Sequence, residues 1–368
     1  MKSLKKTLAF AMAIVLLVAP LSAFGATDEI VAESSAPLTM MKSELRTEGF
    51  TQSELSKMSK EIPEIYEIVT NNDLNDEQLA NLKETFLNIR EVDDSDVQTY
   101  PVDENGIVDM GDHKTIVPHS EYYKGEVQSA DLISSQATNA ASSGVHVMTY
   151  SDPSYRFFKS TGYMDLPDVS VQYNPGSAYP YNSRPYMMYG AYSNSGGFDA
   201  GLVYYEETGS WRLFRNVLGS GWAEKDITLS GDEAYLWLEL NGRNTIIKVI
   251  DPATWSTVGS LTVPAPTSFT TNPSGVNITR EVALAQFVRE NNGDYLKDAH
   301  WNQVYYYRAD GFNTLAKPEY LQSSATGRYS YDSSMPKYLI GDTLSDKSKV
   351  HITPESNYSA EWVDIVLD

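Results

Sequence analysis

The chain has 368 residues and a net charge of −21 at pH 7, from 28 Lys+Arg against 49 Asp+Glu. A strongly acidic protein is repelled by nucleic acid and by anionic membrane surfaces, so neither is expected as a partner. There are no cysteines, which excludes disulfide bonds and thiol catalysis, and the 25 tyrosines favour strands and loops over helices.

The first 25 residues have the three-part layout of a secretory signal peptide. Three lysines lie among the first six residues, an apolar run covers 8–18, and small residues precede a cleavage site before Ala26. The apolar run is shorter than the ~20 residues that a membrane-spanning helix needs. We therefore expect a secreted, Gram-positive type of protein, free in the medium or held non-covalently at the cell wall. Cleavage leaves 25 basic against 49 acidic residues, a charge of −24, and no membrane partner is expected afterwards.

Residues 26–100 are expected to form a helical N-terminal segment. Apolar residues recur at three- and four-residue spacing over 55–69 and again over 79–89. Thr51 followed by Glu54 predicts a capping box at the start of the first helix, which an internal proline interrupts. Two short amphipathic helices cannot bury their apolar stripes alone, so this segment must dock on the rest of the chain or on a partner.

Residues 101–144 are expected to be an acidic loop followed by a linker that is rich in serine and alanine. Four side chains with oxygen donors lie within ten residues: Asp103, Asn105, Asp109 and Asp112. Oxygen ligands at this density are candidates for a Ca²⁺ site, although their spacing does not fit an EF-hand. We favour the alternative of a solvated acidic loop, and expect no cofactor other than this candidate Ca²⁺.

From residue 145 to the end of the chain, the period of the apolar residues changes from 3.6 to 2, which predicts strands. Strands are expected over 198–205, 211–217, 234–240, 245–250, 258–263, 301–307 and 361–367. The dipeptide Asn241-Gly242 predicts a tight hairpin turn. One helix is expected over 280–290, capped by Thr279. Many short antiparallel strands in one domain, 145–368, predict a mainly β, two-sheet sandwich of the jelly-roll kind, able to fold without residues 26–144.

The stretch from Phe198 to Val263 resembles the central strands of concanavalin-like jelly rolls. The resemblance is carried by an aromatic hairpin followed by the run Tyr235-Leu236-Trp237-Leu238-Glu239-Leu240-Asn241-Gly242, and it covers roughly 65 residues. Such folds occur in secreted carbohydrate-binding modules, lectins and polysaccharide-cleaving enzymes. The strand with three alternating carboxylates that marks the jelly-roll glucanases is absent here. The resemblance implies a secreted β-sandwich with a carbohydrate ligand.

The strand over 234–240 supplies the first candidate binding residues. Tyr235, Trp237 and Glu239 share one face of this strand, and the leucines between them occupy the other. If the leucines form the core between the sheets, Trp237 is partly exposed and offers its ring to a sugar. Glu239 would then bind hydroxyl groups or, in an enzyme, donate a proton. The alternative is that both faces of the strand are buried.

Tyr181 and Tyr189 are further candidate ligand-binding residues. They belong to a segment that is rich in tyrosine, proline, glycine and asparagine, a composition typical of recognition loops. Packing in the strand core is the alternative for part of this set. The sequence contains no His-Glu-x-x-His, Gly-x-Ser-x-Gly or phosphate-loop motif, which lowers the expectation of catalysis.

The sequence therefore predicts a secreted, non-catalytic protein whose β-sandwich binds an extracellular or cell-wall glycan. The first alternative is a glycoside hydrolase or polysaccharide lyase with Glu239 as its acid–base residue. The second alternative is a surface or matrix interaction protein that has no sugar ligand.

Overall fold

The computed structural model describes residues 35–119, 144–151, 156–174, 179–286, 292–310, 313–320, 338–340, 349–354 and 361–367. The chain divides into two compact units, one ending at Leu87 and one beginning at Asn88. The predicted signal peptide and nearly all of the predicted linker at 134–144 lie outside the described residues. Within those ranges, no helix combines the length and the apolar character needed to cross a membrane.

The first unit is helical. It contains α3 (Ser35–Thr47), α4 (Gln52–Lys57), α5 (Ile62–Asn71) and α6 (Asp76–Leu87). Thr51 and Glu54 form the predicted capping box: Thr51 N donates to Glu54 Oε2 at 2.6 Å, and Glu54 N donates to Thr51 Oγ1 at 3.2 Å. Pro63 lies in the first turn of α5, where its missing N–H costs no hydrogen bond. The predicted first helix is therefore two short helices.

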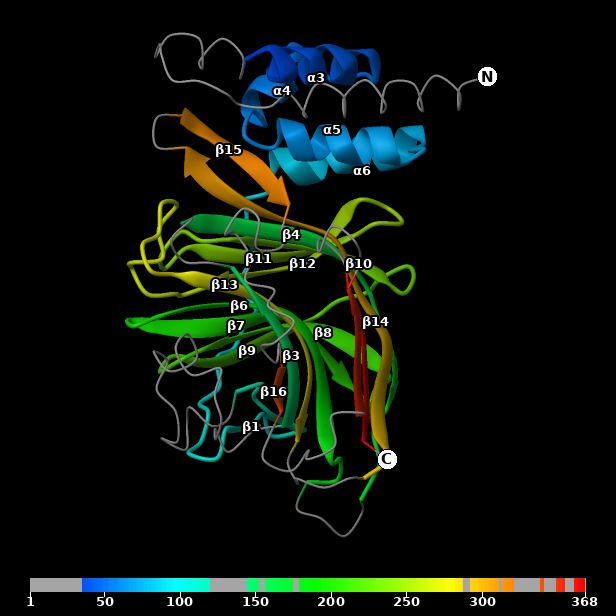
Figure 1. The fold of residues 1–368 in the computed structure, drawn as a ribbon, viewed down its shortest axis with the longest axis vertical. Coiled ribbons are helices and arrows are strands. Elements are labelled where there is room, and N and C mark those ends of the chain that lie inside the picture. The colour runs from blue at the N-terminus through cyan, green and yellow to red at the C-terminus, as the bar shows by residue number, and fades with distance from the viewer. Residues whose placement is uncertain are drawn as a thin grey trace. The chain divides into compact units, whose positions relative to one another are not determined.

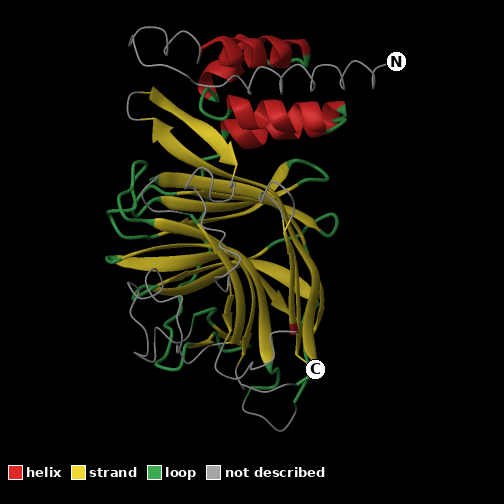
Figure 2. Cartoon of the chain, in the orientation of Figure 1, coloured by secondary structure: helices red, strands yellow, loops and turns green. Residues whose placement is uncertain are grey.

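The second unit consists of antiparallel sheets (Figures 1 and 2). Among the described residues, a seven-stranded sheet has the order β16-β3-β13-β6-β7-β8-β9, and a nine-stranded sheet has the order β12-β11-β10-β4-β14-β18-β17, with β5 and β15 also paired to β14. Strands β1 and β2 form a separate pair. The strands are β1 (Ile107–Asp109), β2 (Lys114–Ile116), β3 (Gly144–Tyr150), β4 (Phe157–Asp165), β5 (Asp168–Ser170), β6 (Ser183–Ser193), β7 (Gly196–Tyr205), β8 (Ser210–Val217), β9 (Gly221–Asp226), β10 (Glu233–Glu239), β11 (Thr245–Asp251), β12 (Ser256–Val263), β13 (Asn277–Gln286), β14 (Asp294–Asp310), β15 (Asn313–Tyr320), β16 (Tyr338–Ile340), β17 (Val350–Pro354) and β18 (Glu361–Leu367).

The predicted hairpins are present, and the mainly β sandwich is confirmed. Strand β7 pairs with β8 in the register Phe198↔Val217, and β10 pairs with β11 in the register Tyr235↔Ile250. Gly242, in the turn between β10 and β11, has a φ of 57°, a left-handed conformation that glycine adopts without strain. Local alternation and turn chemistry thus determine these hairpins.

The helix predicted over 280–290 is wrong. Residues 277–286 form β13, which lies between β3 and β6 and pairs with both along its length. Ile278, Val282 and Leu284 point into the core between the two large sheets. Tertiary pairing and burial on both faces therefore override the helix-like spacing. The rest of the predicted helix, 287–290, lies outside the described residues.

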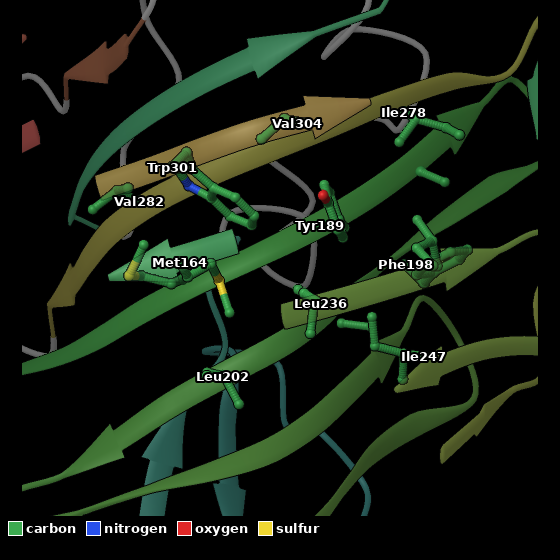
Figure 3. Close-up of a cluster of buried hydrophobic side chains, with 14 of the residues drawn as sticks. Met164, Tyr189, Phe198, Leu202, Leu236, Ile247, Ile278, Val282, Trp301 and Val304 are labelled. Atoms are coloured by element: carbon green, nitrogen blue, oxygen red, sulfur yellow. The ribbon is translucent and has the colours of Figure 1, made fainter. Parts of the chain in front are cut away.

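The main core lies between the seven- and nine-stranded sheets (Figure 3). Its buried side chains include Met164, Tyr189, Phe198, Leu202, Leu236, Ile247, Val282 and Trp301. The leucine face of β10 belongs to this core, as the sequence predicted. The alternation of the strands therefore places one face of each large sheet in the interior of the sandwich.

A second apolar layer covers the outer face of the seven-stranded sheet. Residues 100–119, here called the covering segment, include β1 and β2 and contribute Val108, Ile116 and Val117 to a buried cluster. The sheet contributes Tyr186, Met188, Val203, Phe214 and Trp222. The loop that was expected outside the sandwich is thus packed on it. The boundary between the two units, after Leu87, lies upstream of the predicted domain boundary after residue 100.

Candidate functional site

The strand face that was predicted to bind a ligand is buried. Tyr235, Trp237 and Glu239 are 2%, 0% and 5% exposed. Trp237 therefore offers no ring face to a ligand in this structure, which contradicts the expectation that it is partly exposed. The structure has the alternative arrangement, in which both faces of β10 are buried.

Charged side chains pack against this buried face. Lys159 Nζ lies 4.0 Å from the ring centroid of Trp237 and 3.6 Å from that of Tyr307. Arg90 Nε donates a hydrogen bond to Glu239 Oε1 at 2.9 Å. A buried charge needs such partners. These contacts give Trp237 and Glu239 a clear packing role, whereas their ligand-binding role stays a prediction.

The other two candidate tyrosines lie in different environments. Tyr189 is fully buried between the sheets, and its ring centroid lies 5.1 Å from that of Trp301. Tyr181 is half-buried, and its ring lies 5.4 Å from the ring of Tyr173, which is 61% exposed. The structure thus keeps Tyr181 near the surface beside an aromatic residue that sequence analysis missed, and it places Tyr189 in the core.

The acidic loop is organised by its own backbone and by neighbouring basic side chains. Asp103 Oδ1 accepts hydrogen bonds from the backbone amides of Asn105 and Ile107, both at 2.8 Å. Asp109 pairs with Lys114 at 2.8 Å, and Asp112 pairs with the histidine that follows it at 2.7 Å. The oxygens that were candidates for a Ca²⁺ site therefore form turns and ion pairs, and the solvated acidic loop favoured over that site stays a prediction.

Four ionisable side chains are buried together on the outer face of the seven-stranded sheet. His119 ends the covering segment, His146 is in β3, Asp199 is in β7 and Glu281 is in β13. All four belong to the buried residues of the chain. Strand β13 pairs with β3 and β6, and β6 pairs with β7, so the sheet brings the three strand residues onto neighbouring positions.

Glu281 bridges the two histidines of this cluster. Its Oε2 lies 3.2 Å from His119 Nε2, and its Oε1 is hydrogen bonded to His146 Nδ1. The two imidazole rings are stacked, with centroids 4.6 Å apart and planes inclined by 20°. Asp199 Oδ1 lies 3.9 Å from His119 Nε2 and accepts a hydrogen bond from the Tyr192 hydroxyl. The cluster is thus a continuous network of nitrogen and oxygen donors.

Burial and charge act differently on the two carboxyl groups. Burial raises the pKa of Asp199 to about 6. Burial also acts to raise the pKa of Glu281, but the two adjacent histidines outweigh it and lower that pKa to about 2. Separated carboxyl pKa values and histidine–carboxylate groups are both features of functional sites. Of the described residues, His119, His146 and Glu281 have the arrangement that could hold a metal ion.

No local motif marks this cluster in the sequence. Its members are separated by up to 162 positions, and none of the histidines is part of His-Glu-x-x-His. The available signal was Glu281, a charged residue inside the apolar alternation of residues 277–286. The prediction of a helix there concealed that signal, because it placed Glu281 on no sheet face.

The chain matches no family model and no curated protein. Among solved structures, Scytalido-glutamic peptidase with a peptide-based transition-state analogue is similar over 61% of this chain and 98% of its own, with 8% identity and a TM-score of 0.35. The same peptidase with a transition-state analogue inhibitor matches over 60% and 97%, with 7% identity and a TM-score of 0.33. A functionally unknown protein from Saccharomyces cerevisiae matches over 38% and 62%, with 13% identity and a TM-score of 0.23. At these scores the matches carry no argument about chemistry.

Proposed function

We propose that this is an exported protein whose β-sandwich binds a neutral extracellular or cell-wall glycan without cleaving it. The observation that carries the proposal is the surface tyrosine pair Tyr173 and Tyr181, with ring centroids 5.4 Å apart. Tyrosine combines a broad apolar face with a hydroxyl group, so a pair offers stacking area and hydrogen bonds to a sugar. The predicted signal peptide and the concanavalin-like pattern of 198–263 favour the same class of function.

The backbone holds the tyrosine pair in place. Tyr173 and Tyr181 are bridge partners. Asn174 N donates to the Pro180 carbonyl at 2.5 Å, on one side of the bridge. On the other side, the amide of Gln172 donates to Asp294 Oδ1 at 2.6 Å. A preorganised aromatic pair loses little conformational entropy on binding, which favours affinity.

Polar groups lie beside the pair, as a ligand rich in hydroxyl groups requires. Burial, followed by the charges of Glu207 and Glu206, raises the pKa of Tyr181. Glu207 accepts two hydrogen bonds from Arg184, at 2.9 Å and 3.0 Å, and is thereby fixed. A site with a few fixed polar groups around an apolar surface is typical of small-ligand recognition.

The charge of the protein selects the class of glycan. The mature chain is expected to carry a charge of −24, and the charge of Glu206 contributes to the environment of Tyr181. Anionic polysaccharides are repelled by such a surface, whereas neutral ones are not. A neutral polysaccharide is therefore the ligand that fits.

Affinity gel electrophoresis tests this proposal with wild-type protein and Tyr173→Ala. The wild type is expected to be retarded by at least one neutral polysaccharide, such as a β-glucan or a xylan, and not by alginate. Tyr173→Ala is expected to migrate as in a gel without polysaccharide. Its melting temperature should stay unchanged because the side chain is exposed.

Trp362→Ala is the matched control. Trp362 is another exposed aromatic residue, 38% exposed, and it stacks on His300 in the paired strands β18 and β14. The Trp362→Ala variant should be retarded by the polysaccharide to the same extent as wild type. Retardation of Tyr173→Ala to the wild-type extent, or no retardation of wild type by any neutral polysaccharide, would refute the proposal. Release of reducing sugar by the wild type would favour the hydrolase alternative.

A further inference from the structure

We infer that His119, His146 and Glu281, with Asp199 beside them, bind one divalent transition-metal ion that fastens the covering segment to the seven-stranded sheet. The first three side chains each offer one donor atom, and these atoms all lie within 4.8 Å of one another. The site shares no residue with the tyrosine pair of the glycan proposal. Either can hold without the other.

The donor set is the kind that zinc takes in proteins. Imidazole nitrogen and carboxylate oxygen bind zinc at about 2.0–2.2 Å, so two donors on one tetrahedral ion lie roughly 3–3.5 Å apart. The 3.2 Å between Glu281 Oε2 and His119 Nε2 already meets that spacing. Asp199 Oδ1 lies beside this group, 3.9 Å from the same nitrogen, and is not one of the three mutually close donors.

Tyr192 supports two of these ligands from outside. Its hydroxyl donates a hydrogen bond to Asp199 Oδ1, which orients that carboxylate. Its ring packs edge-on against the His119 imidazole, with centroids 6.1 Å apart and planes inclined by 89°. Outer contacts of this type orient metal ligands and are part of the design of metal centres.

The charges of the cluster balance around one divalent cation. Metal ions bind neutral imidazole and ionised carboxylate. The two carboxylates of Asp199 and Glu281 therefore match the charge of one divalent ion. The imidazole nitrogens select a transition metal such as zinc over Ca²⁺, which takes oxygen ligands.

Burial assigns the ion a structural role. His119, His146 and Glu281 are all buried, and zinc sites that are closed to solvent and substrate are the structural type. His119 comes from the covering segment, whereas the other ligands come from the sheet. The ion would therefore cross-link two parts of the chain, as a disulfide would in a protein that has cysteines.

Metal analysis of the full-length, untagged protein tests the inference. Protein stripped with a chelator in denaturant and refolded with Zn²⁺ is expected to keep one zinc per chain through gel filtration, measured by mass spectrometry of the metal. Refolding with Co²⁺ is expected to give visible d–d absorption bands. Stripped wild type should melt at a lower temperature than zinc-loaded wild type.

Two histidine variants of the same segment give the matched comparison. His119→Gln is expected to reduce bound zinc to background and to abolish the metal-dependent rise in melting temperature. His113→Gln removes an imidazole that contacts Glu224 instead, and it should keep its zinc. Equal zinc in His119→Gln and wild type would overturn the inference. So would a wild type without retained zinc or cobalt bands, a result that needs no variant to fold.

Discussion

Two groups of candidate metal-ligating side chains involve the covering segment, and they are assembled in opposite ways. The acidic loop gathers Asp103, Asn105, Asp109 and Asp112 within ten residues of sequence. At the end of the same segment, His119 meets Glu281, which is 162 positions away, on the face of a sheet. The loop is exposed, and the histidine cluster is buried.

Side chains that are close together in the sequence therefore need not meet at one point in space. Carboxylates that are close in sequence reach the nearest amides and basic side chains, as Asp103 and Asp109 do, and turns result. Side chains on neighbouring strands that point to the same side of a sheet are held close together by the pairing of the strands. The covering segment links the two groups, so the comparison can be tested by disturbing it in steps of decreasing size.

Removal of the segment should have the largest effect. The fragment 88–368 is expected to melt cooperatively. The fragment 145–368, which the sequence predicted to fold alone, should lose cooperative melting and near-ultraviolet circular dichroism, because it exposes the apolar outer face of the seven-stranded sheet. Equal melting temperatures for the two fragments would show that the covering segment does not stabilise the β-sandwich. They would also show that the contacts of the histidine cluster add nothing to its stability.

Removal of a large side chain beneath the segment should have the next largest effect. Trp222 is fully buried, stacks on Phe214 at 4.7 Å and exchanges two backbone hydrogen bonds with Tyr100. Trp222→Ala leaves a cavity and should lower the free energy of unfolding by about 3–5 kcal/mol, as urea denaturation would measure. Trp211→Ala, at a half-buried tryptophan of β8, is the control and should cost clearly less. Equal losses of unfolding free energy would show that Trp222 is not the main apolar contact of the covering segment.

A smaller effect should follow from Glu224, the sheet carboxylate that holds His113 of the segment at 3.0 Å. Burial acts to raise the pKa of Glu224, but hydrogen bonds from His113, Tyr205 and Arg212 outweigh it and lower the pKa to about 2. Because the folded pKa lies below the ordinary value of 4.5, this group stabilises the fold above pH 4.5. That contribution is lost as the pH falls towards 2.

Glu224→Gln is therefore expected to lower the free energy of unfolding by about 1.5–3 kcal/mol at pH 7 and to differ little from wild type near pH 2. Thermal melts over this pH range would measure the convergence. Asp226→Asn is the matched control, because Asp226 also pairs with Arg212, at 2.9 Å, but its side chain is exposed. A constant difference between Glu224→Gln and wild type from pH 7 to pH 2 would contradict the pKa assignment.

Local signals in the sequence were sufficient for much of the fold. Alternation and turn residues located β7, β8, β10 and β11, and the leucine face of β10 is core as expected. Strand β13 was missed because its register depends on partners that are distant in sequence. Parity assigned Trp237 correctly to the face opposite the leucines, but whether a face is exposed depends on what covers it, and parity carries no such information.

The candidate sites were predictable to a smaller extent. Tyr181 was singled out from composition, whereas its partner Tyr173 becomes visible only through the bridge that joins their segments. The histidine cluster depends on the pairing of β3, β13, β6 and β7 together with the path of the covering segment. None of these long-range relations leaves a spacing rule in the sequence, so the cluster could not be assembled from it.

The smallest effect is expected at Asp109, and it brings the comparison back to the two groups of ligands. Asp109 and Lys114 form an exposed ion pair, and such pairs contribute little to stability. Ca²⁺ needs six to eight oxygen ligands, whereas the Asp109 oxygens are already engaged by Lys114 and the amide of Gly111. We therefore expect Asp109→Ala to have the same melting temperature as wild type, with or without added CaCl₂. A bound ion would add roughly 2.7 kcal/mol at a hundredfold excess over its Kd. A calcium-dependent rise in the melting temperature of wild type that Asp109→Ala abolishes would therefore show that the acidic loop binds a metal ion after all.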